Sequence, residues 1–257
     1  MPKNKNTSWS ESAEWYHGLL SSGADTYQKK VILPNLLRLL EIKKSETILD
    51  LACGEGFFSR EFAKSGAAVI GADITPELIL IAKKVSPANI DFQIAGADYM
   101  PFLKKGSMDK AVIVLALQNM ENVEVVLKEC ARVLKPDGKL YLVLNHPTFR
   151  VPKASSWGWA DAEKIQYRRI DRYLSESKTK IQMHPGDKPT EYTLSFHRPL
   201  QFYFKALNKN SFAVTRLEEW ISHRKSQPGP RAQAEDVARK EIPMFLFLEA
   251  ENRDAIS

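Results

Sequence analysis

The sequence predicts an α/β fold built on a doubly wound parallel sheet. Its 257 residues are 44% hydrophobic and 26% charged, which is typical of a globular chain long enough to bury one large core. Short apolar segments that suit buried strands alternate with segments of helical periodicity through the first 145 residues. Strands that are apolar on both faces indicate a parallel sheet with helices on each side, and right-handed crossovers favour the doubly wound arrangement.

Two helices are expected ahead of this alternation. Ser10 or Ser12 is a suitable cap for the first, which carries apolar residues from Ala13 to Leu20. The second is predicted over residues 26–40, where leucines recur at helical spacing in spite of Pro34. We therefore expect residues 9–40 to form a helical cap beside the sheet.

The strands and helices of the sheet then follow one another closely. A buried strand ends at Cys53, and the turn Gly54-Glu-Gly56 leads into a helix. Pro76 suits the first turn of a later helix because its missing N–H is not needed there. The predicted strands are 47–53, 68–73, 90–95, 109–115 and 139–145, and the predicted helices are 57–65, the helix opened by Pro76, and 123–134.

After Pro147 the alternation stops for about 50 residues. Simple connections between elements are much shorter, so this segment must have an organisation of its own. We expect residues 147–198 to be a lid inserted after strand five, at the carboxyl edge of the sheet, and residues 1–257 to be a single domain. Regular elements resume with a helix at 200–207, a strand at 213–221, a short helix near 232–240 and a strand at 244–250.

The net charge of +6 is concentrated in the predicted lid. Residues 150–198 hold 10 basic and 6 acidic side chains, whereas residues 1–149 hold 18 and 17. A uniformly basic surface for nucleic acid is therefore a poor description of the chain. The distribution indicates a local basic site instead.

Composition also disfavours several protein classes. No window approaches about 18 uncharged apolar residues, so we expect no membrane span. The polar N-terminus lacks the apolar core of a signal peptide. Cys53 and Cys130 are too few for a disulfide framework, and nothing indicates a metal site. We expect a cytoplasmic protein.

The segment Asp50-Leu-Ala-Cys-Gly-Glu-Gly56 is the first candidate for a ligand site, because ligands of open α/β sheets bind beyond the carboxyl ends of the strands. Its glycines permit a tight turn and a close approach to a ligand. Phe57-Phe58 stands where a phosphate-binding P-loop needs Lys followed by Ser or Thr, which excludes that mode of ATP or GTP binding. The third glycine of a dinucleotide fingerprint is also missing.

Five sequence elements in the right order resemble the motifs of class I S-adenosylmethionine-dependent methyltransferases, and the layout resembles the ubiquinone/menaquinone-type, methyltransferase domain 11/25 group. The resemblance implies a Rossmann-like, seven-stranded doubly wound sheet of order 3-2-1-4-5-7-6 with strand 7 antiparallel. It also implies S-adenosylmethionine as cofactor, which carries no phosphate and suits a glycine loop without Lys or Arg. The elements are the loop 50–56, Asp73 at 19 residues after Gly54, Gly96–Tyr99, Asp109–Gln118, and the turn Arg132–Lys139.

The resemblance assigns a place at the cofactor to particular residues. Asp73 would accept hydrogen bonds from the ribose hydroxyls, and Asp98 would bind the adenine amino group. Leu115 would lie near the sulfonium. For the three aspartates the alternative is structural, as caps of loop amides for Asp50 and Asp73 and as a turn residue for Asp98. The full predicted set is Asp50, Ala52, Cys53, Gly54 and Gly56 around the methionine end, Asp73 at the ribose, Ile74, Ala97, Asp98 and Tyr99 at the adenine, Leu115, and Tyr27 from the helical cap.

The methyl acceptor is expected to meet residues of the lid and of the end of strand five. His146 is the best candidate for a base or for an acceptor-orienting group, and His197 returns to the same rim. Arg172 belongs to a run of arginines and aromatic residues that could hold an anionic or carbonyl-bearing group. The alternatives are a structural hydrogen bond for His146 and surface ion pairs for the arginines, including Arg168.

Three functions remain in order of preference. The first is methyl transfer to a small-molecule acceptor of aromatic or acidic character. The second is methylation of tRNA or another RNA, with the basic lid on phosphates and its tryptophans on bases. The Asn/Asp-Pro-Pro-aromatic motif of enzymes that methylate amino groups in nucleic acids is absent after strand four, which disfavours base N-methylation by that mode. The third is a non-catalytic protein that binds S-adenosylmethionine, since a fold does not fix its function.

Overall fold

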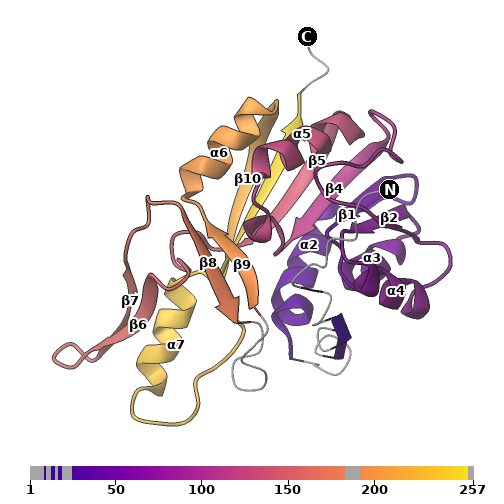
Figure 1. Ribbon diagram of the computed structural model, residues 1–257. Coiled ribbons are helices and arrows are strands. Elements are labelled where there is room, and N and C mark those ends of the chain that lie inside the picture. Colours follow the sequence, from indigo (N-terminus) through magenta and orange to yellow (C-terminus); the bar gives the residue numbers. More distant parts are fainter. Residues whose placement is uncertain (1–8, 10–12, 15–16, 19–24, 183–191, 254–257) are drawn as a thin grey trace.

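The computed structural model describes residues 9, 13–14, 17–18, 25–182 and 192–253 (Figure 1). The first predicted helix, with Trp15 and Tyr16, lies largely outside the described residues. No helix within the described part of the chain is both long and apolar enough to span a membrane.

A seven-stranded sheet forms the centre of the molecule (Figure 1). The first five strands run parallel in the order β3-β2-β1-β4-β5, and β11 then pairs antiparallel with both β5 and β10. This is the predicted order 3-2-1-4-5-7-6 with the seventh strand antiparallel, so the predicted fold class is confirmed. The strands are β1 (Thr47–Leu51), β2 (Ala68–Asp73), β3 (Asp91–Ile94), β4 (Met108–Val114), β5 (Leu134–Asn145), β10 (Phe212–Trp220) and β11 (Phe245–Asn252).

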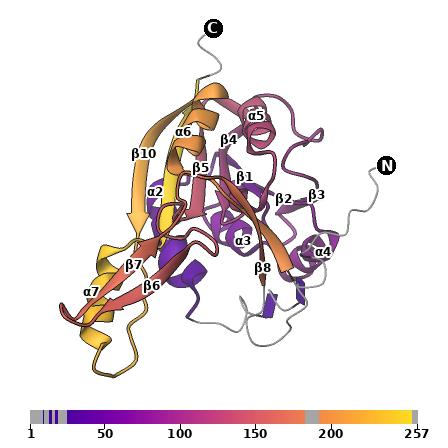
Figure 2. The ribbon, with the colours of Figure 1, turned by 60° about the vertical axis from the view of Figure 1, so that its left-hand side comes forward.

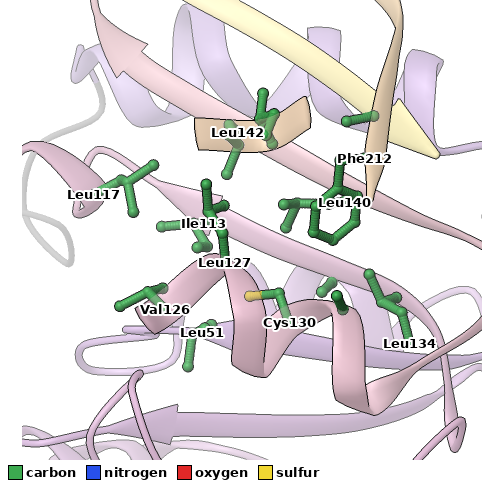
Figure 3. Packing of buried hydrophobic residues seen from close by; sticks show 14 of the residues in the cluster. Leu51, Ile113, Leu117, Val126, Leu127, Cys130, Leu134, Leu140, Leu142 and Phe212 are labelled. Atoms are coloured by element: carbon green, nitrogen blue, oxygen red, sulfur yellow. The ribbon is translucent and has the colours of Figure 1, made fainter. Parts of the chain in front are cut away.

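Helices cover both faces of the sheet and enclose a core on each side. Because side chains alternate along a strand, Leu142 of β5 packs toward one core and Val143 toward the other. Figure 3 shows the first of these cores, in which Leu127 and Cys130 of a covering helix face the sheet. One face carries α5 (Val123–Val133) and α6 (Leu200–Lys209), and the other carries α2 (Leu33–Leu40), α3 (Phe57–Ala63) and α4 (Pro76–Val85).

The helix predicted over residues 26–40 has two parts. A π-helical turn, η1 (Gln28–Ile32), precedes α2, and the Leu33 N–H donates to Gln28 O, five residues back. Pro34 lies at the start of α2 and has no N–H, so a regular α-helical ladder cannot pass through this point. The π turn therefore lies where the proline interrupts the ladder.

The strand predicted over 139–145 begins earlier than expected. β5 starts at Leu134, which pairs with Met108 of β4, and a register shift follows before Lys139 pairs with Lys110. The residues between Leu134 and Lys139 include Pro136 and Gly138, which are usual in turns after a helix. For this reason the sequence predicted a turn here and a later start of the strand.

Two antiparallel hairpins occupy the segment that was expected to be a lid. The first hairpin packs against α7 (Ala232–Glu241), as Figure 2 shows. The Arg231 guanidinium, just before α7, lies 4.6 Å from the centre of the Trp159 ring. The hairpin strands are β6 (Ser155–Ala160) with β7 (Ile165–Ile170), and β8 (Ser177–Gln182) with β9 (Tyr192–His197). That this segment acts as a lid, within a single domain of 1–257, stays a prediction.

Candidate active site

A cavity of about 590 Å³ lies at the carboxyl edge of the parallel strands. Its size is that of a small-molecule site. Most of its lining comes from two parts of the chain, the loops that follow the strands and residues between 150 and 195, and Trp9, Gln28 and Leu78 complete it. The strand-end wall includes Ala52, Gly54, Asp73, Ile74, Leu115 and Ala116, and the opposite wall includes Arg150, Lys153, Ser155, Arg168, Thr193 and Ser195.

The loop after β1 is built by backbone conformations that few residues adopt. Ala52 and Gly54 both have positive φ angles, of 58° and 57°, and both line the cavity. Gly56 has a φ of 80°, and a Cβ at this position would lie 2.7 Å from the Phe92 ring. Only glycine fits there without displacing the ring, and α3 begins at the next residue.

Asp73 fixes this loop to the end of β2. One carboxylate oxygen accepts the Gly54 N–H at 3.0 Å, and the other accepts the Thr75 N–H at 2.8 Å. The side chain is 7% exposed, and burial raises the pKa of its carboxyl against the lowering effect of these hydrogen bonds. Asp73 also lines the cavity, and a carboxylate oxygen can accept more than one hydrogen bond, so the same side chain can hold the loop and contact a ligand.

Asp50 and Cys53 are buried and do not line the cavity. The Ser59 hydroxyl donates to Asp50 Oδ2 at 2.5 Å. Burial raises the pKa of Asp50 to about 7, assisted by the nearby charge of Asp73. Burial also raises the pKa of the Cys53 thiol, which disfavours the thiolate that a nucleophile requires.

The residues predicted for the adenine end lie beside the cavity and not in its wall, except for Ile74. A Cβ built on Gly96 would lie 2.5 Å from Asp98 Oδ1 and 3.8 Å from Ile74 Cδ1, so these side chains flank the same turn. Tyr99 is 68% exposed. Ala97 also lies outside the cavity wall.

Of two further residues predicted to lie at the cofactor, Leu115 lines the cavity and Tyr27 does not. Leu115 follows β4 with a φ of 53°, donates its N–H to Val143 O, and lines the cavity as expected. The Tyr27 hydroxyl lies 3.1 Å from Ser222 Oγ, and its ring meets His223 edge-on. Tyr27 therefore faces the segment after β10, and the next residue, Gln28, lines the cavity in its place.

His146 is held in the scaffold and does not line the cavity. Its Nε2 lies 2.7 Å from Glu219 Oε1 of β10, and its Nδ1 accepts the Thr148 N–H at 3.3 Å. Nδ1 as acceptor assigns the proton to Nε2, which then donates to Glu219. Burial lowers the pKa of the imidazole in spite of Glu219. With both nitrogens engaged, the geometry favours an anchoring role over general-base catalysis.

His197 and Arg172 are also outside the cavity wall. His197 is 4% exposed, and its Nε2 lies 2.7 Å from the carbonyl oxygen of Tyr173. Arg172 is exposed, with a φ of 54°. The structure thus brings none of the three predicted catalytic residues to the cavity, because each belongs to a turn or strand end that points toward the scaffold or solvent.

We expect His146→Ala to lower the free energy of unfolding by about 1–3 kcal/mol, because the variant removes a buried side chain and leaves the partly buried Thr148 N–H without its acceptor. The affinity for S-adenosylhomocysteine should stay within about twofold of wild type, since the imidazole does not touch the cavity. Urea unfolding and calorimetric titration measure the two quantities. Wild-type stability with a large loss of affinity would contradict the anchoring role.

Several cavity residues were not among the predicted site residues. Asn145 ends β5 and lines the cavity, whereas the adjacent His146 does not. Gln118 donates from Nε2 to Leu115 O at 2.7 Å, and its buried Oε1 has no hydrogen-bond partner among the described residues. Arg150 and Arg168 lie in the basic stretch that the charge count had singled out. Side chains alternate along a strand, and this alternation was the signal that could have predicted Asn145 as the cavity residue in place of its neighbour His146.

No group of three or more His, Cys, Asp or Glu residues that could hold a metal ion occurs in the described parts of the chain. The donor set at the strand ends instead combines backbone groups with the Asp73 carboxylate. Every basic side chain in the wall comes from residues 150–168. A sulfonium cofactor without phosphate fits this donor set, because neither Lys nor Arg is needed at the loop.

A sheet of this order, with a glycine loop after β1 and a carboxylate at the end of β2, defines the class I S-adenosylmethionine-dependent methyltransferases. The chain matches the family model for a methyltransferase domain over residues 49–142. These residues form a class I methyltransferase domain, and S-adenosylmethionine is the cofactor of this class. The predicted resemblance is confirmed.

Individual relatives agree with this class. A demethylmenaquinone methyltransferase of Tropheryma whipplei (strain Twist) is 36% identical over 113 residues, which cover 43% of this chain and 46% of that protein. A ubiquinone biosynthesis O-methyltransferase of Xanthomonas oryzae pv. oryzae (strain PXO99A) is 32% identical over 122 residues, 46% of this chain and 49% of that protein. The chain thus spans about half the length of the curated relatives it matches.

A solved structure extends the similarity beyond that half. An S-adenosylmethionine dependent methyltransferase from Mesorhizobium loti superposes with a TM-score of 0.68 and 26% sequence identity. The match covers 85% of this chain and 96% of the other. It therefore includes most of the segments outside residues 49–142.

Proposed function

We propose that this protein is an S-adenosylmethionine-dependent methyltransferase that methylates a small-molecule acceptor of aromatic or acidic character. The observation that carries the proposal is one cavity shared by two walls, with Asp73 and Gly54 on one side and residues of 150–195 on the other. Such an arrangement would allow a cofactor and a second molecule to bind in contact with each other.

The names of the curated relatives suggest a quinone-type acceptor as one chemical class. Their similarity, however, is confined to about half of this chain. The cavity wall formed by residues 150–195 lies largely beyond the family match at 49–142. The acceptor is therefore argued from this wall and not from the relatives.

The proposed roles follow from the geometry. S-adenosylmethionine supplies an electrophilic methyl group on its sulfonium. Asp73 would accept hydrogen bonds from the ribose hydroxyls while its backbone partners keep the loop in place. Leu115 and Ala116, which follow β4, line the same cavity and would lie near the sulfonium. Rate enhancement would come from holding the acceptor in line and excluding water, both of which a cavity walled from two sides favours.

The proposal is tested by binding and by label transfer. We expect S-adenosylhomocysteine to bind in a calorimetric titration with one site per chain. Protein incubated with methyl-labelled S-adenosylmethionine should transfer label to a component of a metabolite extract, and heat-inactivated protein should not. Absence of S-adenosylhomocysteine binding would contradict the proposal at its first step.

Parallel incubation with total tRNA separates the alternatives. Label in tRNA, with none in the metabolite extract, would replace the small-molecule acceptor by RNA. Tight binding of S-adenosylhomocysteine with transfer to neither would favour a non-catalytic protein. The cytoplasmic location stays a prediction from the sequence.

A further inference from the structure

Two arginines in the acceptor wall of the cavity have no acidic partner among the described residues. Arg150 follows β5, Arg168 lies in the middle of β7, and both line the cavity. The hydrogen bonds and ion pairs of the described residues join neither guanidinium to a carboxylate. In the same hairpin Arg169 does find a carboxylate, with its Nε 3.1 Å from Asp171 Oδ2.

Arg168 is held rigidly in place by uncharged groups. Its Nε donates to Phe149 O at 2.8 Å and one terminal nitrogen donates to Ser155 Oγ at 2.7 Å. Its guanidinium lies 5.2 Å from the centre of the Trp157 ring. The other terminal nitrogen has no partner among the described residues. A preorganised donor of this kind loses little conformational freedom when it binds a ligand.

Arg150 faces the same space. Arg150 is exposed and lines the cavity, and desolvation by the surrounding chain lowers the pKa of its guanidinium. Arg168 Nε donates to the carbonyl oxygen of Phe149, the residue before Arg150, and both arginines line the cavity, so two like charges face the same space. Burial lowers the pKa of Arg168, and the charge of Arg150 lowers it further. Repulsion between them is unfavourable unless a negative group lies between or beside them.

The described lining of the cavity as a whole also carries more positive than negative side chains. Arg150, Lys153 and Arg168 contribute three positive charges, and Asp73 on the cofactor side is the one acidic side chain in the described lining. A neutral methyl acceptor would leave the positive charges of Arg150 and Arg168 without a negative charge to balance them. Guanidiniums that face one cavity can donate to a carboxylate or phosphate group bound there.

We propose that Arg150 and Arg168 bind an anionic group of the methyl acceptor, a carboxylate or a phosphate carried on a small molecule. This inference rests on the proposed function and narrows its acceptor. It separates this protein from a methyltransferase whose acceptor is a neutral quinol. Arg150 and Arg168 then determine which substrates enter the cavity.

The test uses matched probes on the full chain saturated with S-adenosylhomocysteine. Benzoate and benzamide have the same ring and nearly the same shape but differ in charge, and phenyl phosphate is a second anion. We expect benzoate or phenyl phosphate to bind in a calorimetric titration, with benzamide weaker by about tenfold or more because a charge-assisted hydrogen bond is lost. Equal binding of benzoate and benzamide, or binding of none of the three probes, would overturn the proposal.

Arg150→Gln is the decisive variant, because its guanidinium makes no hydrogen bond to the described residues and its removal should leave the fold intact. We expect this variant to lower the affinity for the anion by about tenfold or more. Arg169→Gln is the matched control, because this side chain is 66% exposed and outside the cavity wall. It should bind the anion as wild type does. Unchanged anion affinity in Arg150→Gln would overturn the proposal.

Affinity for S-adenosylhomocysteine, measured first in each variant, distinguishes this proposal from the proposed function. If the wild-type chain does not bind S-adenosylhomocysteine, methyl transfer itself is contradicted. If it binds S-adenosylhomocysteine but binds benzoate and benzamide equally, only the anion site is contradicted. If total tRNA displaces benzoate with a steep dependence on salt, a polyanion occupies the arginines and the small-molecule acceptor is wrong.

Discussion

Asp73→Ala is expected to weaken S-adenosylhomocysteine binding by about 1–3 kcal/mol, or about 5- to 150-fold. The substitution removes the carboxylate that we assign to the ribose hydroxyls. It also leaves the Gly54 and Thr75 N–H groups without their acceptors, so the loop that lines the cavity loses its anchor. Calorimetric titration of the purified variant measures the loss.

Asp91→Ala is the matched control, because Asp91 begins β3 at an exposed position and contacts Gln93 rather than the loop. Its affinity should equal that of wild type. If Asp73→Ala loses stability in urea but binds S-adenosylhomocysteine normally, Asp73 is only a structural anchor and the ribose assignment is wrong.

Asp50→Asn is expected to stabilise the ligand-free protein, and to do so increasingly as the pH rises. Burial raises the pKa of Asp50 from 3.8 to about 7, so between about pH 4 and pH 7 the folded state holds a proton that the unfolded state has lost. Wild-type stability therefore falls as the pH rises through this window. The full cost above pH 7 is about 4 kcal/mol. Asparagine has no charge to bury and avoids this cost.

Urea unfolding at pH 5 and pH 8.5 tests this expectation. The difference in unfolding free energy between variant and wild type should be larger at pH 8.5 by about 2–3 kcal/mol. Asparagine can still accept the Ser59 hydroxyl, and any cost of its buried NH₂ group is the same at both pH values. Asp91→Asn, at an exposed site, is the control. An equal difference at both pH values would show that Asp50 is ionised throughout.

The cofactor half of the molecule could be predicted largely from the sequence. Strand β2 has the predicted bounds, 68–73, and the glycine loop, Asp73 and Leu115 meet at one cavity. Local constraints explain this success. Buried parallel strands are continuous apolar runs, and a loop with positive φ at Gly54 and Gly56 leaves a clear trace in the sequence.

The acceptor half could not be predicted in the same way. The strands of the two hairpins are mostly partly exposed and rich in polar residues, so apolar alternation is confined to short stretches such as Tyr192, Leu194 and Phe196 of β9. Side-chain direction was a further obstacle. His146 and Asn145 are neighbours, yet only Asn145 lines the cavity, and His146 reaches Glu219 on a strand more than 70 residues away in sequence.

The insertion between β5 and α6 has an evolutionary consequence. The sheet is complete without it, because β5 pairs directly with β4 and β11, and the residues at the cofactor end all precede the insertion. Under the proposed function, substitutions in the hairpins would therefore change the acceptor without disturbing the binding of the methyl donor. An exchange of residues 148–198 between paralogues should transplant substrate choice as one module, with the donor site inherited unchanged.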